Sequence, residues 1–173
     1  QGKLWGYNSS EGKKLYPFNA KTFAASGTPI ETSENVVDLT GAPEVKGGIP
    51  YSGGTMDSPA SLVYVNGRNQ IGYLWEDSEG NSKASYVWDD SNRLSAIAYV
   101  GYLTAEKVRA QFPDLGNCDN NAVCHVYYAL AEDEDGNVST LRQLILVPQV
   151  DTSGTLTYTL CGKNIGTVAG ITG

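Results

Sequence analysis

The sequence predicts an all-β fold of antiparallel meanders, arranged as a β-sandwich or as propeller-like blades, with one short helix near residues 104–112. The main observation is a repeated unit, in which an aromatic strand, an acidic or polar turn closing on Gly and a second strand follow one another. It occurs at residues 4–12, 73–81 and 128–137. Repetition of one supersecondary unit is typical of arrays and propellers. Turn signals between short alternating segments are the second observation.

The chain of 173 residues is most simply one domain, residues 1–173, and is long enough to bury a core without disulfides. After the first repeat, residues 17–60 are rich in Pro and Gly, and only residues 35–39 are predicted as a strand. We interpret residues 17–60 as a loop-rich N-terminal part. Surface loops commonly carry binding residues, so this part is expected to contribute to a binding site.

The next two strands, residues 61–65 and 68–75, flank the dipeptide Asn66-Gly67. This dipeptide is a strong hairpin signal because both residues tolerate a positive φ. A two-residue turn pairs Val65 with Arg68. Period-2 alternation then places an aromatic stripe on one face of the meander, formed by Tyr64, Tyr73, Trp75, Tyr86 and Trp88.

The meander continues with strands at residues 83–88 and 93–100, joined by the polar turn of residues 89–92. The face opposite the aromatic stripe carries Val63, Val65, Leu74 and Val87. Because both faces are apolar, each is expected to pack against another part of the protein.

The helix at residues 104–112 is predicted from Thr104, a suitable N-cap residue, and from Pro113, which ends it. A second β block follows the helix. Its predicted strands are residues 123–131, 138–147, 155–161 and 165–171.

The charge of the chain excludes one large class of partners. A net charge of -7 and a pI near 4.6 argue against nucleic acid, because nucleic-acid binding depends on clustered Lys and Arg. The longest aliphatic run, residues 144–147, is far shorter than the roughly 20 residues of a membrane span. We therefore expect a protein that does not span a membrane.

The localisation expected from composition is secreted or on a cell or virion surface. Two glycosylation sequons begin at Asn8 and Asn137, and both fall on predicted turns. No charged-then-apolar leader opens the given sequence, so any export signal is expected to have been removed.

No catalytic residue, metal site or cofactor is predicted. His125 is the only histidine and neighbours Cys124 on a predicted strand, where the two side chains point to opposite faces. They cannot act together as base and nucleophile. Cys118, Cys124 and Cys161 have no zinc-site spacing, and either three buried thiols or one disulfide and a free thiol fit them.

The acidic residues leave two alternatives open. Residues 133–137 have the acidic density of an EF-hand loop but not its spacing, so calcium at this turn is an alternative to a solvated turn. The 19 acidic residues also allow a carbohydrate-active hydrolase that uses paired carboxylates.

Aromatic residues are the best candidates for ligand binding, because their flat faces stack on sugar rings and their polar tips form hydrogen bonds. Core packing is the alternative for each of them. The candidate ligand-binding residues are Trp5, Tyr7, Tyr51, Trp75 and Trp88.

Residues 61–81 resemble one blade of the fungal fucose-specific lectin β-propellers, and residues 124–138 are similar to the same element. In that family an Arg on the aromatic strand and a Glu after the turn hold the sugar. The corresponding positions here are Gly72 and Ala84 in the first copy, and His125 and Thr140 in the second. The resemblance therefore implies surface recognition, without fucose specificity. A second similarity, from the pair Leu4-Trp5 and the chain length, is to the antiparallel sandwiches of trimeric adenovirus fibre heads.

Together these observations predict an extracellular carbohydrate- or receptor-binding module, lectin-like or adhesin-like, without catalytic activity. Its expected partner is a glycan or glycoprotein receptor, and a homo-oligomer is expected. The alternative is a structural subunit of a surface appendage or virion fibre, whose strand edges pair with copies of itself.

Overall fold

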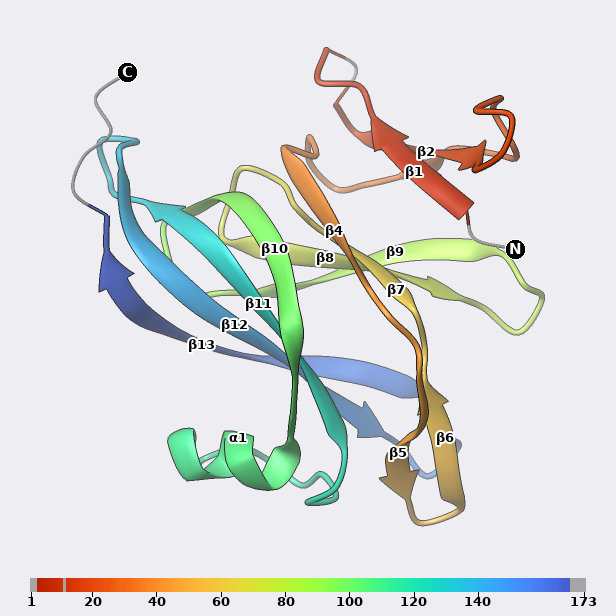
Figure 1. The fold of residues 1–173 in the computed structure, drawn as a ribbon, viewed down its shortest axis with the longest axis vertical. Helices are drawn as coiled ribbons and strands as arrows, with labels where there is room; N and C mark the ends of the chain where they lie inside the picture. The colour runs from red at the N-terminus through yellow and green to blue at the C-terminus, as the bar shows by residue number, and fades with distance from the viewer. Residues whose placement is uncertain (1–2, 11, 169–173) are drawn as a thin grey trace.

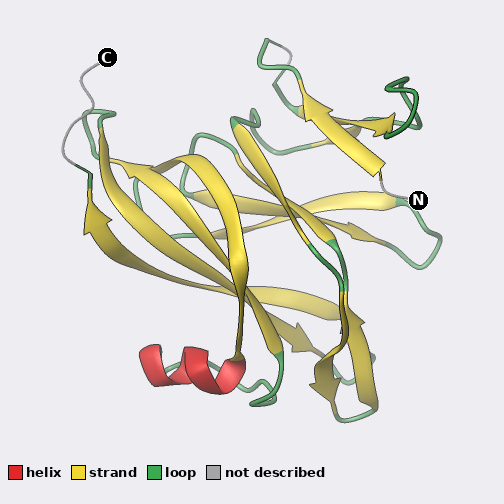
Figure 2. Ribbon diagram, viewed as in Figure 1, coloured by secondary structure: helices red, strands yellow, loops and turns green. Residues whose placement is uncertain are grey.

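The computed structural model describes residues 3–10 and 12–168, and it confirms the all-β fold. Two four-stranded antiparallel sheets pack face to face as a sandwich (Figures 1 and 2). The first sheet has the order β4-β7-β8-β9 and contains β4 (Asp38–Ala42), β7 (Ser61–Val65), β8 (Gln70–Glu76) and β9 (Ser82–Trp88).

The second sheet has the order β10-β11-β12-β13, and its four long strands follow one another as a meander. These strands are β10 (Arg93–Thr104), β11 (Val123–Glu132), β12 (Val138–Val150) and β13 (Leu156–Thr167). The strand predicted at residues 165–171 is the end of β13 as far as Thr167, and positions 169–171 lie outside the described residues.

The main core lies between the two sheets. Inward residues of the first sheet, such as Val63 and Ile71, meet inward residues of the second, such as Leu94 and Leu144, and all four are fully buried. Tyr73 and Tyr158 meet across this core edge to face, with ring centroids 5.0 Å apart. Burial of these side chains from both inner faces is the usual way in which a sandwich is stabilised.

The outer face of each sheet is covered in part. The predicted four-strand meander of residues 61–100 is wrong in its last strand, because β10 belongs to the second sheet. Both faces of its first three strands pack at least in part, as predicted. The helix α1 (Ala105–Gln111) places Ala105 and Val108 against the outer face of the second sheet. It lies at the bottom left of Figure 1, within the predicted range of residues 104–112. Tyr64 and Leu15 belong to a third cluster on the outer face of the first sheet.

A small sheet made by β1 (Lys3–Tyr7), β2 (Lys14–Asn19) and β3 (Ile30–Glu31) forms the other side of this third cluster. A two-stranded ribbon, β5 (Val45–Tyr51) and β6 (Gly54–Ser58), projects at the opposite end of the molecule (Figure 1). Residues 17–60 thus contain more strand than predicted. Pro17 in β2 and Pro50 in β5 obscured these strands, because Pro is unfavourable within a central strand.

The predicted register of the β7–β8 hairpin is wrong. Val65 lies opposite Ile71, not three residues earlier, and Tyr64 lies opposite Gly72. An odd shift moves a strand's side chains to the other face. The predicted stripe is therefore divided between the two faces of the sheet: Tyr64 shares the outer face with Tyr86 and Trp88, whereas Tyr73 and Trp75 lie on the other face. Tyr64 covers Gly72, where an added Cβ would come within 2.0 Å of the tyrosine ring.

Candidate functional site

The five aromatic residues predicted to bind a ligand do not form one site. Trp5 and Tyr7 lie on β1, and Tyr51 ends β5. Trp75 and Trp88 lie at opposite ends of the β8–β9 hairpin, since Trp75 pairs with Lys83 at one end and Trp88 ends β9 at the other. The odd register difference between them also puts their side chains on opposite faces of the sheet.

Three of these residues make contacts that stabilise the fold. Trp5 packs against the third apolar cluster and is half-buried. The hydroxyl of Tyr7 donates a hydrogen bond to the carbonyl of Val37 at 2.7 Å, which ties β1 to the main sheet. The half-buried Tyr51 ring lies 2.5 Å from where a Cβ on Gly53 would stand, so the ring covers the turn of the β5–β6 ribbon.

Trp75 is 44% exposed, and its indole Nε1 donates a hydrogen bond to Ser85 Oγ at 2.9 Å. This bond lies across the β8–β9 pair and holds the ring along the sheet. The polar tip of Trp75 is thereby used within the protein, which leaves mainly its ring face for a ligand.

Trp88 has the largest exposed ring surface of the five, with 57% exposure. Tyr86, which is 43% exposed, meets it edge to face with ring centroids 5.8 Å apart and an interplanar angle of 84°. Both side chains lie on the outer face of β9, because they are two residues apart on one strand. We call this pair the Tyr86–Trp88 platform.

Hydrogen bonds at the end of β9 hold the strand that carries the platform. Trp88 pairs across the sheet with Gln70, whose side chain is buried and accepts a hydrogen bond from Asn66 Nδ2 at 2.6 Å. The backbone of Asp89 donates to the carbonyl of Asn69 at 2.8 Å, directly after the platform. These bonds fix the end of β9, so the exposed rings are presented by an ordered strand.

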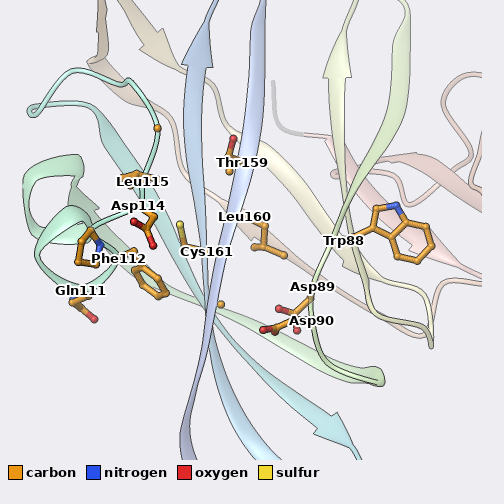
Figure 3. Close-up of a pocket in the computed structure, with 13 residues that line it drawn as sticks. Trp88, Asp89, Asp90, Gln111, Phe112, Asp114, Leu115, Thr159, Leu160 and Cys161 are labelled. Atoms are coloured by element: carbon orange, nitrogen blue, oxygen red, sulfur yellow. The ribbon is translucent and has the colours of Figure 1, made fainter.

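An open groove of about 490 Å³ adjoins Trp88. It runs between the turn after β9 and the segment after α1, across β13 (Figure 3). Its lining residues are Trp88, Asp89, Asp90, Gln111, Phe112, Pro113, Asp114, Leu115, Gly116, Thr159, Leu160, Cys161 and Gly162.

A buried ion cluster forms one end of this groove. Arg142 Nη2 binds Asp89 Oδ1 at 2.7 Å and also binds Asp90, while its Nη1 donates to Asn164 Oδ1 at 2.6 Å. The side chains of Arg142 and Asp89 are 7% and 2% exposed, whereas that of Asp90 is 82% exposed. Only Gly fits at 162, since its Cβ would stand 2.5 Å from Asp89 Oδ1.

His125 has a hydrogen-bond partner that the sequence did not indicate. Its Nε2 lies 3.0 Å from Ser58 Oγ, and its Nδ1 lies 3.4 Å from the hydroxyl of Tyr99. Burial lowers the pKa of His125, so the imidazole is neutral near pH 7. Ser58 and His125 are both almost fully buried, which makes this pair a link between β6 and β11 and closes it to substrate. Cys124 points to the opposite face, as predicted.

The three cysteines are free thiols around the cluster under α1. Burial raises the pKa of Cys124 to about 12. Cys161 pairs with Ile145 on β12, and Ile145 pairs with Val126 on β11. Cys124 lies two residues before Val126 on β11, so Cys161 and Cys124 are more than two strand spacings, or more than about 9–10 Å, apart. This exceeds the Cα separation of about 7 Å that a disulfide spans.

In the acidic turns, an Asp carboxylate accepts hydrogen bonds from backbone N–H groups of the same turn. Asp133 Oδ1 accepts the N–H groups of Asp135 and Asn137 at 3.0 and 2.9 Å. Asp77 and Asp151 form the same pair of bonds in their own turns. Within residues 3–10 and 12–168, no three His, Cys, Asp or Glu side chains are grouped to hold a metal ion.

Of the exposed aromatic residues that the sequence analysis did not name as candidates, Phe23 is the most exposed. Phe23 is 71% exposed and has a φ of 56°, in the left-handed region that large residues rarely adopt. Asn19 Oδ1 accepts the N–H groups of Lys21 and Thr22, and this local cap holds the turn that presents Phe23. Nothing in the spacing of apolar residues signals it, since it lies in a short polar loop.

A scan against protein-family models finds no match to this chain. A search of curated proteins also finds none. Among the helices of the described residues, none has the length and apolar character needed to cross a membrane.

Proposed function

We propose that this chain is an extracellular, lectin-like or adhesin-like module that binds a glycan or glycoprotein receptor at the Tyr86–Trp88 platform, without catalysis. The observation that carries the proposal is the pair of perpendicular, exposed rings at the end of β9. A sugar presents its C–H groups to an aromatic face and its hydroxyl groups to polar neighbours. Asp90, two residues beyond Trp88, has an exposed carboxylate for such hydroxyl groups.

The charge of the chain supports a neutral glycan as the ligand. The net charge is -7, and Asp89 and Asp90 directly follow the platform. An anionic sugar brought to this edge meets like charge, which opposes binding at low salt.

The contacts of Asp89 and Asp90, two of the residues with carboxylates that line the groove, support a non-catalytic role. Asp89 is buried and paired with Arg142, so its carboxylate cannot reach a glycosidic bond, and Asp90 alone does not supply the two carboxylates that glycoside hydrolysis needs. We propose secretion or display on a cell or virion surface on the same grounds as above, with Asn8 and Asn137 both exposed in turns.

The test is a glycan array followed by calorimetry on any neutral glycan that binds. Trp88→Ala is expected to weaken binding about 10-fold to 100-fold, equivalent to about 1–3 kcal/mol, because it removes the central ring of the platform. Trp75→Ala is the matched control, since it removes an equally large exposed ring from the opposite face. A Trp88→Ala protein that binds as tightly as the parent, or a parent that binds no glycan while folded, contradicts the proposal.

A further inference from the structure

The two edge strands of the second sheet, β10 and β13, are covered to different degrees. On one side β4 lies beside β10, and side chains of β4 cover the edge of β10. Asp38 Oδ2 accepts the N–H of Ile97 at 2.8 Å, and Thr40 Oγ1 accepts the N–H of Tyr99 at 3.1 Å. These two bonds satisfy backbone donors that an edge strand would otherwise leave free.

On the other side β13 ends the second sheet, and the turn before it determines which backbone groups face outward. Asp151 N–H bonds to the carbonyl of Thr155 at 3.1 Å, and the β12–β13 register is regular from this turn to Lys163. Hydrogen-bonded and non-hydrogen-bonded pairs alternate along an antiparallel ladder. The residues of β13 that bond to β12 are therefore Thr157, Thr159, Cys161 and Lys163.

The alternate residues, Tyr158, Leu160 and Gly162, direct their N–H and C=O groups away from β12. Pro148 stands opposite Tyr158, which agrees with this alternation because Pro has no N–H to offer. The hydrogen bonds of residues 3–10 and 12–168 include none from these outward groups. β13 thus has an edge of about three donors and three acceptors ready for another strand.

The groove follows this edge. Four consecutive residues of β13, from Thr159 to Gly162, line it, although their side chains alternate between the two faces of the sheet. The feature that four consecutive residues share is the backbone edge, so the groove lies along that edge. Phe112 and Leu115 bound it on one side and Asp90 on the other (Figure 3).

We infer that the free edge of β13 binds the β13 strand of a second copy of this chain, antiparallel, to form one continuous eight-stranded sheet. Residues 156–162 contain no charged residue and no Pro. Pairing centred on Leu160 puts Tyr158 opposite Gly162 and Lys163 opposite Thr157, so no like charges meet. In a two-fold contact of this kind, the free β13 edge of each copy is paired with that of the other.

This inference goes beyond the proposed function and does not depend on it. The contact uses the backbone of β13, whereas the platform uses ring faces on the outer side of β9, although Trp88 and Asp90 also line the groove beside β13. Loss of glycan binding and loss of the dimer are separate observations.

The experiment combines sedimentation equilibrium with amide hydrogen exchange measured by NMR over about a thousandfold range of protein concentration. The association expected is monomer to dimer. The amides of Tyr158, Leu160 and Gly162 should become protected as the dimer forms. Those of Thr157, Thr159 and Cys161 should be protected at every concentration, because they bond to β12.

Thr159→Lys is expected to weaken the association at least about tenfold, since the new charge lies diagonal to Lys163 of the second copy. Thr152→Lys adds the same charge in the exposed turn before β13 and should leave the association unchanged. A monomer over the whole range overturns the inference, as does a dimer in which the alternate amides exchange as they do in the monomer. Equal association of the Thr159→Lys variant also overturns it.

Discussion

Arg142 shows what single residues contribute to this fold. It reaches from β12 to the turn after β9 and joins the two sheets through Asp89, 53 residues earlier in the chain. Asp89 Oδ2 and Arg142 Nε are buried and have no hydrogen-bond partner among the described atoms. The hydrogen bonds of the pair therefore replace only part of the hydration that the two groups lose on burial. A buried ion pair of this kind adds little net stability, but loss of one partner leaves an uncompensated charge in the interior.

Arg142→Met is therefore expected to lower the free energy of unfolding by about 3–5 kcal/mol, measured by urea denaturation. Arg93→Met is the matched control. Arg93 binds Glu132 at 3.1 Å with a side chain that is 52% exposed, and its replacement should cost about 1 kcal/mol or less. Equal losses for the two variants would mean that the buried pair is compensated as well as a surface one.

The exposure of individual aromatic residues was the least predictable feature. The sequence analysis put Trp88 on one face with Tyr64, Tyr73, Trp75 and Tyr86, but Tyr73 and Trp75 lie on the opposite face. Of the two residues that share the face of Trp88, Tyr64 is fully buried and Tyr86 is exposed. Which ring is exposed depends on strand register and on the small β1–β3 sheet, and neither follows from alternation within one strand.

At the scale of elements, one turn design recurs three times, at residues 77–81, 133–137 and 151–155. In each, an Asp carboxylate accepts two backbone N–H groups and Gly takes a φ of 78°, 84° or 85°. Three-residue hairpin loops with Gly in the left-handed position have this form. The sequence predicted the first two from their acidic residues and Gly, and such local chemistry is what a sequence specifies best.

Gly136→Ala is expected to destabilise the protein by about 1–2 kcal/mol, because the Cβ of alanine makes a left-handed backbone sterically unfavourable. Gly166→Ala is the control, since this strand glycine has no positive φ and no atom within 4 Å of an added Cβ. Thermal unfolding of both variants measures the difference. A Gly136→Ala protein as stable as the control would rule out a rigid left-handed turn at this position.

The loop at Asn66-Gly67 shows why the register was mispredicted. Asn66 Nδ2 bonds to Gln70 inside the protein, and the carbonyl of Arg68 accepts the N–H of Leu94 at 2.9 Å. The loop is therefore held open by contacts with the chain after β9. A two-residue turn would lose these bonds, and no local signal reports partners so far along the sequence.

At the scale of the whole molecule, buried titratable side chains limit the pH range of stability. Burial lowers the pKa of His125 below the ordinary value of 6.5. It raises the pKa of Tyr64 and of Tyr158 to about 12, above the ordinary value of 10.0. Below pH 6.5 the unfolded chain takes up a proton on His125 before the folded chain does. Above pH 10 the unfolded chain loses tyrosine protons first.

Burial also raises the pKa of the three cysteine thiols above the ordinary value of 9.0, so the unfolded chain loses these protons first as the pH rises. Stability is therefore expected to be level between about pH 7 and about pH 8 and to fall on both sides. The free energy of unfolding from urea titrations across this range measures it. Tyr64→Phe should reduce the alkaline fall, because phenylalanine has no proton to lose in either state, while the decline below pH 6.5 should remain. A stability that rises as the pH falls from 7 to 5 would contradict a neutral, buried His125, since a histidine stabilised in its charged form gives the opposite slope.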